Sequence, residues 1–151
     1  TGAEHGKDFP LVDAQGRTAS FSGAHTLGTH RVASAPGVIA AGNLLSHAGV
    51  PEAMVAAFTA GAGRPLGDRL LAAMRAAEEA GGEEGPVPSV GMILVRDVAW
   101  PVADLRVDWA DEDPIAEIAA LWERWKGEME AYVSRALNPS QAPSYGVPGD
   151  M

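Results

Sequence analysis

Residues 38–45 read VIAAGNLL, a short apolar run that ends in a glycine and an asparagine. The segment VIAA is too short for a helix and begins with two β-branched side chains, which favour extended backbone. We therefore predict a buried strand that ends at Gly42 and Asn43. The elements on either side of this strand decide the fold class.

A hairpin is predicted upstream, where residues 9–23 read FPLVDAQGRTASFSG. Two short apolar runs flank DAQG, and Gly16 can take the positive φ that a tight turn requires. In the second run hydroxyl-bearing residues alternate with apolar ones, which predicts one polar face and one more apolar face. Residues 24–37 hold two histidines between glycines and a proline, and we expect a loop there.

Two helices are predicted downstream, because Pro51 and Pro65 each precede apolar residues at helical spacing. The pair Gly81–Gly82 then supplies a stop signal. The continuous apolar run VGMILV, residues 90–95, predicts a strand covered on both faces. The segment DLRVDW, residues 104–109, alternates as a half-buried strand does.

The longest helical pattern spans residues 113–137, with Asp113 as its predicted N-cap. Asn138–Pro139 should end it, and we expect residues 138–151 to form an irregular tail. The order of hairpin, strand, two helices, two strands and one helix predicts an α+β fold. We expect residues 1–151 to form a single domain.

Composition narrows the range of partners. The chain of 151 residues has a formal net charge of −9 and no cysteine. Such a charge repels nucleic-acid phosphates and anionic lipid surfaces, so we expect neither partner. No apolar run approaches the roughly 20 residues of a membrane helix. The lack of cysteine excludes disulfides and a cysteine nucleophile and fits the cytoplasmic location that we predict.

No complete catalytic or metal-binding motif is present. The histidines lack the paired spacing of a metal site, so we expect no metal and interpret them as loop or surface residues. The sequence contains no GxSxG elbow, no GxGxxG loop and no P-loop. The run EEAGGEEG is more typical of a solvated loop than of paired acid–base catalysts.

Thr1 raises a separate possibility. A threonine hydroxyl becomes a nucleophile when a base lies beside it, and a terminal threonine has its own α-amino group, with a pKa of about 7.7–8.0. One residue then supplies both nucleophile and base. The alternative is that Thr1 is an incidental start without chemical meaning, and the residue alone leaves both interpretations open.

Several segments together resemble one bacterial family. They include LVDAQGRTASFSGAHTLG, VIAAGNLL, WPVADLRVDW and YVSRALNPSQAPSYGVPGD. The order of V-D-x-x-G-R, S-G, G-N, A-G-G-E and D-L-R-V-D is similar to that in proteins grouped as domain of unknown function 1028 (DUF1028). The resemblance implies a four-layer αββα sandwich like that of N-terminal-nucleophile (Ntn) hydrolases, of which this chain would supply the C-terminal part.

Members of that family are typically longer, with an N-terminal portion of strands and a helix that has no counterpart here. Either a precursor cleaves itself before Thr1 and the missing portion persists as a companion α chain, or the break at Thr1 is incidental. In both cases the strand at residues 38–43 would expose an edge and an apolar face. We therefore expect a companion chain from the same precursor, or a homo-oligomer.

The resemblance implies an Ntn-type amidohydrolase acting on a small amide, a cyclic amide or a peptide. Thr1 would be the nucleophile, and Asn43 would help to hold the oxyanion while Gly42 allows close approach of the backbone. Ser22, Gly23 and His25 would line the same pocket, and no cofactor would be required. Three alternatives stay open: a simple Gly-Asn turn at this point, a non-catalytic protein that binds a small metabolite, and a structural assembly subunit.

Overall fold

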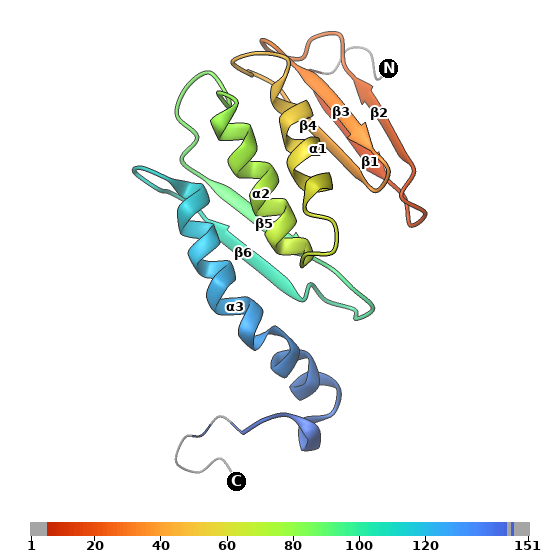
Figure 1. The fold of residues 1–151 in the computed structure, drawn as a ribbon, viewed down its shortest axis with the longest axis vertical. Helices are drawn as coiled ribbons and strands as arrows, with labels where there is room; N and C mark the ends of the chain where they lie inside the picture. Colours follow the sequence, from red (N-terminus) through yellow and green to blue (C-terminus); the bar gives the residue numbers. More distant parts are fainter. Residues whose placement is uncertain (1–5, 145, 147–151) are drawn as a thin grey trace. The chain divides into compact units, whose positions relative to one another are not determined.

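A computed structural model describes residues 6–144 and 146. The chain divides into two compact units, an N-terminal unit (Thr1–Val87) and a C-terminal unit (Pro88–Met151), and each is described by itself. Both units combine antiparallel strands with helices (Figure 1). The α+β class predicted from the order of elements is therefore confirmed.

The predicted hairpin is confirmed. Strands β1 (Asp8–Val12) and β2 (Thr18–Ser22) pair antiparallel, with Phe9 opposite Phe21. Gly16 has a φ of 74°, and the Asp13 carboxylate accepts hydrogen bonds from the backbone N–H groups of Gln15 and Arg17. The short side chain of Asp13 thus closes the turn locally, which is why the sequence signal was sufficient.

A second hairpin replaces the loop expected at residues 24–37. Strand β3 (Arg31–Ala35) pairs antiparallel with β4 (Val38–Gly42) across a tight turn in which Gly37 has a φ of 76°. The expectation of a loop was wrong for β3 because its small residues, Ala33, Ser34 and Ala35, carry little strand signal of their own. Pairing with β4 supplies what local propensity lacks.

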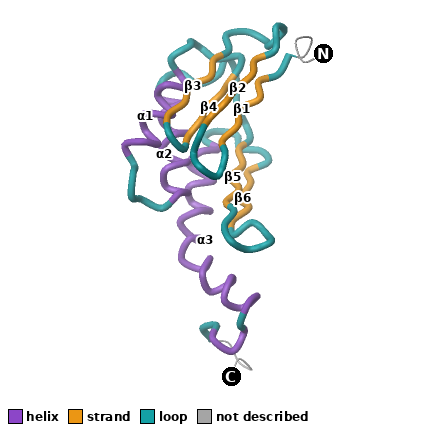
Figure 2. Tube along the Cα trace, turned by 90° about the vertical axis from the view of Figure 1, so that its right-hand side faces the viewer, coloured by secondary structure: helices purple, strands orange, loops and turns teal. Residues whose placement is uncertain are grey.

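The two hairpins lie side by side, with β1 next to β4 and β2 next to β3 (Figure 2). Their turns are also joined, since the N–H of Gly37 donates to the carbonyl of Gly16 at 2.9 Å. Strand β4 is half-buried rather than fully buried, apart from Ala40. The strand predicted at residues 38–41 therefore exists, but helix cover on one side leaves it only partly enclosed.

The N-terminal unit is completed by helices α1 (Val50–Ala60) and α2 (Leu66–Glu79). Helix α1 contacts β3, β4 and α2, so it forms the layer that covers the second hairpin. Arg69 of α2 donates from Nε to the carbonyl of Phe58 at 3.1 Å, and its guanidinium lies 3.8 Å from the centre of the Phe58 ring. These contacts join α2 to α1 at Phe58, a buried aromatic residue of α1. The buried apolar side chains of this unit are Ala40, Leu45, Val50, Phe58 and Ala73.

The C-terminal unit consists of β5 (Val90–Leu94), β6 (Ala103–Val107), α3 (Pro114–Leu137) and the short 3₁₀ turn η2 (Pro139–Gln141). Asp113 caps α3 by accepting from the N–H of Ala116 at 2.7 Å, as the sequence predicted. Helix α3 contacts both strands and η2. The buried apolar residues here are Met92, Leu94, Val102, Ala103, Val107, Ala110, Ile115, Ile118 and Trp122.

Strand β5 is covered on only one face, contrary to the expectation from its continuous apolar run. Met92 and Leu94 are buried, whereas Ile93 between them is 62% exposed. A two-stranded sheet packed on a single helix has one open face, so the alternate residues have nothing to cover them. Trp109 is likewise 72% exposed, because β6 ends at Val107 before reaching it.

Trp122 provides the first test of this packing, since it is only 2% exposed. We expect Trp122→Ala to lower the free energy of unfolding by about 3–5 kcal/mol, through lost burial and the cavity left behind. Leu137→Ala on the same helix is the control, because Leu137 is 64% exposed and its loss should cost within about 0.5 kcal/mol. Denaturant unfolding measures both, and equal losses would contradict this account of the core.

Candidate functional site

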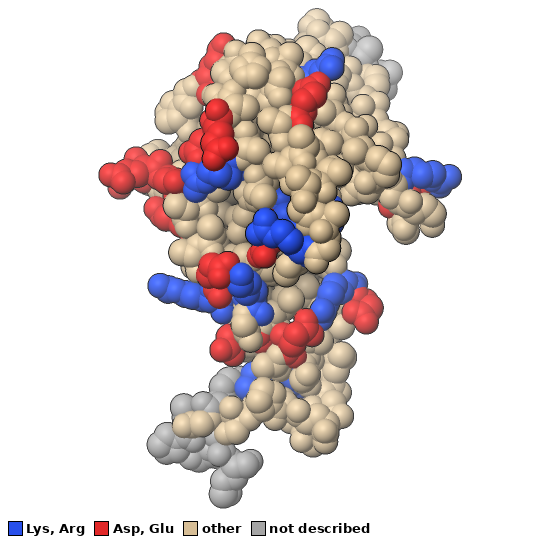
Figure 3. Space-filling view, viewed as in Figure 1, with Lys and Arg blue, Asp and Glu red and all other residues tan. Residues whose placement is uncertain are grey.

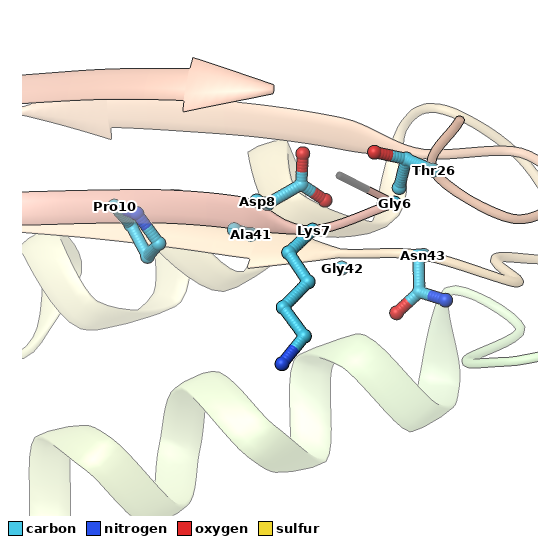
Figure 4. Close-up of a pocket in the computed structure, with 8 residues that line it drawn as sticks. All are labelled: Gly6, Lys7, Asp8, Pro10, Thr26, Ala41, Gly42 and Asn43. Atoms are coloured by element: carbon cyan, nitrogen blue, oxygen red, sulfur yellow. The ribbon is translucent and has the colours of Figure 1, made fainter. Parts of the chain in front are cut away.

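A pocket of about 360 Å³ lies where β4 ends and the segment leading into β1 passes beside it (Figure 4). Three separate stretches of the N-terminal unit line the pocket: the residues around the start of β1, Thr26, and the end of β4 with Asn43. The lining residues are Gly6, Lys7, Asp8, Pro10, Thr26, Ala41, Gly42 and Asn43. The volume lies at the low end of the range for small-molecule sites.

The turn after β4 has an unusual backbone. Leu44 has a φ of 52°, in the left-handed region that a bulky residue rarely occupies. Its N–H donates to the carbonyl of Leu27 at 3.1 Å, and its carbonyl accepts from the N–H of Glu84 at 2.6 Å. Gly28 lies directly against it, since a Cβ there would be 3.2 Å from the Leu44 Cα. Hydrogen bonds on both sides therefore hold a conformation that costs on the order of 1–3 kcal/mol.

Asn43 immediately precedes this turn and is half-buried. Within the described residues its side-chain amide has no hydrogen-bond partner. An amide offers two N–H donors and one carbonyl acceptor, and a partly buried one without partners retains free donors for a bound molecule. In Figure 4 the Asn43 side chain extends to the same side of the strands as that of Lys7.

The segment after the turn is fastened to the end of α2. The N–H of Ser46 donates to the carbonyl of Gly82, and Leu45 forms an isolated antiparallel bridge with Glu83. His47 adds two bonds: its Nε2 lies 2.6 Å from the carbonyl of Ala80, and its Nδ1 accepts from the N–H of Gly49 at 3.0 Å. Because the carbonyl oxygen can only accept, Nε2 is the donor in this contact.

The other wall of the pocket comes from the start of β1. The N–H of Gly23 donates to the carbonyl of Lys7 at 3.0 Å, and the Thr26 hydroxyl donates to the carbonyl of Gly23 at 2.9 Å. Gly6 passes so close to His25 that a Cβ would lie 2.6 Å from the His25 carbonyl oxygen. The lack of a side chain at Gly6 therefore allows the segment before β1 to pack against the backbone of His25.

The proposed site residues separate into three groups. Gly42 and Asn43 line the pocket, whereas Gly23, Ser22 and His25 do not, although the backbones of Gly23 and His25 support its wall. Thr1 lies outside the described residues. Lys7, Asp8 and Thr26 line the pocket without having been singled out, because they belong to no motif and reach it only through the pairing of distant segments.

A surface ion pair joins β3 to α1, and neither of its residues lines the pocket. Arg31, opposite Gly42 in the β3–β4 register, donates from Nε to Glu52 of α1 at 2.8 Å. This guanidinium lowers the pKa of the Glu52 carboxyl. Both side chains are largely solvated, so the pair contributes little to stability.

Charge on the surface is mixed. Arg17, Arg31, Arg75 and Arg96 each pair with an acidic residue, and Figure 3 shows no continuous basic stripe on the face in view. Within residues 6–144 and 146, His, Asp and Glu form no group of three or more that could hold a metal ion. None of the helices described is both long and apolar enough to cross a bilayer.

Residues 3–118 match the sequence profile described as a family of unknown function, DUF1028. The chain belongs to the DUF1028 family. The comparison with curated proteins found no match. A crystal structure of the DUF1028 protein SPO2555 from Silicibacter pomeroyi is similar, with 30% identity and a TM-score of 0.68. The similarity covers 78% of this chain and 51% of the other, so the chain spans about half the length of that relative.

The contact between the segment after the turn and the end of α2 can be tested at Gly81. This residue has a φ of 110°, and a Cβ added to it would lie 2.5 Å from Ser46 Oγ. We expect Gly81→Ala to lower the free energy of unfolding by about 1–3 kcal/mol through strain, plus the cost of this contact. Gly63→Ala is the control, since Gly63 has a φ of 86° with nothing within 4 Å. Equal losses in thermal or denaturant unfolding would show that the approach to Ser46 is unimportant.

Proposed function

We propose that the pocket at the end of β4 binds and hydrolyses a small amide, in the manner of an Ntn hydrolase. One observation carries the proposal. The turn at Leu44 has a left-handed backbone held by two hydrogen bonds, and directly before it the side-chain amide of Asn43, which has no partner among the described residues, lines a pocket of small-molecule size. Strained backbone persists where the surrounding structure fixes it, and it is concentrated at functional sites. Family resemblance to Ntn hydrolases supports the choice of chemistry.

Asn43 would stabilise the developing oxyanion. When a nucleophile adds to an amide carbonyl, negative charge gathers on the carbonyl oxygen, and a fixed N–H donor lowers the energy of that state. The Nδ2–H groups of Asn43 have no competing acceptor within the described structure. Gly42 has no side chain, and a Cβ there would lie 2.7 Å from Leu45 Cδ2, so the glycine lets Leu45 pack against the end of β4 beside Asn43.

Thr1 would be the nucleophile. It precedes Gly6 of the pocket by five positions, so an extended chain keeps it within about 18 Å. Its Oγ would add to the carbonyl carbon while its α-amino group takes the hydroxyl proton. That proton then passes to the leaving nitrogen as the C–N bond breaks, and water hydrolyses the resulting ester to restore Thr1. The proposal requires a free amine at Thr1 in the mature protein.

We also propose that this chain is one part of a four-layer αββα sandwich. The β1–β2 ribbon has an apolar face formed by Phe9, Leu11 and Phe21, which are 48%, 65% and 47% exposed. The matched relative is about twice as long as the region that this chain covers. A companion segment equivalent to the unmatched half of that relative would cover the exposed face.

The catalytic proposal is tested with purified protein and a panel of small linear amides, cyclic amides and dipeptides. We expect Thr1→Ala to abolish turnover, and Asn43→Ala to lower kcat about 10²–10³-fold with a smaller change in KM. Asn138→Ala is the matched control, since Asn138 caps α3 in the other unit. N-terminal sequencing establishes whether the amine is free.

Absence of turnover of any amide by protein with a free Thr1 would contradict the hydrolase. Ligand binding that survives Thr1→Ala, with no turnover in either form, would instead identify a non-catalytic metabolite-binding protein. The pocket supports this second function, because its described lining residues form a cavity of small-molecule size.

The companion proposal is tested by association of this chain with the remaining part of the protein. Phe21 and Ser20 are neighbours on opposite faces of β2. We expect Phe21→Asp to weaken association at least tenfold while leaving the fold of this chain intact, and Ser20→Asp to have a much smaller effect. Analytical ultracentrifugation measures both, and equal effects would show that the apolar face is not the contact.

A further inference from the structure

The two charged residues that line the pocket direct their side chains to opposite sides of β1. Lys7 and Asp8 are neighbours in the chain, and successive side chains of an extended strand point to opposite faces. Figure 4 shows the Lys7 ammonium on the same side as the Asn43 side chain and the Asp8 carboxyl on the other side. Asp8 therefore does not neutralise Lys7, although the two residues are adjacent.

Lys7 is one of two lysines in the chain. The other, Lys126, lies 2.6 Å from a carboxylate oxygen of Glu123 on α3, whereas Lys7 forms no ion pair within residues 6–144 and 146. The Lys7 side chain is exposed, so water solvates its ammonium in the free protein. No contact with a described carboxylate has to break before Lys7 can pair with an anion.

Asn43 adds hydrogen-bond donors to the same pocket. Neither its side-chain amide nor its backbone N–H has a partner among the described residues. Every lining residue other than Lys7 and Asp8 is uncharged, so the side of the pocket that holds Lys7 and Asn43 has a single full charge, which is positive. The net charge of −9 does not cancel this local effect, because salt screens exposed charges beyond about 8–10 Å.

We propose that Lys7 makes the pocket selective for small amides that carry a carboxylate, such as N-acylated amino acids. The ligand carboxylate would pair with the Lys7 ammonium while the amide carbonyl accepts from the Asn43 side chain. The flexible stem of lysine lets the ammonium follow the carboxylate. The position of the amide rests on the proposed function, whereas the charge contact does not. A pocket of about 360 Å³ holds a molecule of this size.

Two probes of equal size isolate the charge. N-acetylalanine carries a carboxylate at neutral pH, and N-acetylalaninamide has a neutral carboxamide in its place. Binding is measured by calorimetry with the complete protein, companion segment included, in the Thr1→Ala form so that neither probe is hydrolysed. We expect N-acetylalanine to bind about fivefold more tightly at low salt, with a preference that shrinks as salt is added. Equal affinities, tighter binding of the neutral probe or no binding of either probe would overturn the proposal.

Three variants assign the preference to a residue. Lys7→Gln should abolish it by weakening the binding of N-acetylalanine alone, and Lys7→Arg should retain it because the guanidinium keeps the positive charge. Lys126→Gln is the matched control, since it removes the other lysine, on α3 in the C-terminal unit, and the preference should persist. An unchanged preference in Lys7→Gln, or an equal loss in Lys126→Gln, would show that Lys7 does not select the ligand.

Turnover by the protein with Thr1 intact separates this proposal from the hydrolase. Hydrolysis of both probes with equal kcat/KM would refute the selectivity and leave the hydrolase standing. Binding of N-acetylalanine that depends on Lys7, with no turnover of any amide, would support the selectivity and refute the hydrolase.

Discussion

The left-handed backbone at Leu44 is the constraint on which the candidate site depends. The backbone N–H of Leu44 donates to Leu27, and the carbonyl of Leu44 accepts from Glu84. These two hydrogen bonds hold the chain in its observed path through the turn after β4. That path sets where Asn43 lies and directs the following residues toward the end of α2, where Ser46 and His47 are bound. The site is therefore positioned by backbone hydrogen bonds between distant segments.

Hydrogen-bonding capacity is distributed unevenly in this unit. Asp13 pairs with Arg17 and Arg31 pairs with Glu52, and both ion pairs lie at the surface. Asn43, Asp8 and Lys7 have no such partners among the described residues, and all line one pocket. Water reaches the exposed Lys7 side chain, whereas Asp8 Oδ1 is buried without a partner, and a native structure keeps few such buried groups. This contrast is the physical reason for placing function here.

The sequence predicted the elements whose signals are local and missed those that depend on partners. The turn at Asp13–Gly16, the helix starts at Pro51 and Pro65 and the cap at Asp113 each act within a few residues. Strand β3 was missed because its small residues become a strand only beside β4, and the open face of β5 depends on how many layers cover it. Within the site, Gly42 and Asn43 were accessible as a strand end. Lys7 and Asp8 were not, since no local pattern shows which distant segment lies beside them, and nothing in a leucine signals positive φ.

Membership in DUF1028 and the half-length match fix the family, and the chemistry is a proposal that one measurement tests most directly. The complete protein is treated with an activated acylating amide analogue, the products are digested, and the modified residue is located by mass spectrometry. Our account predicts a single acyl group on the Thr1 side chain, formed more slowly in Asn43→Ala. Acylation of another residue, or none on a protein whose Thr1 amine is free, would contradict it.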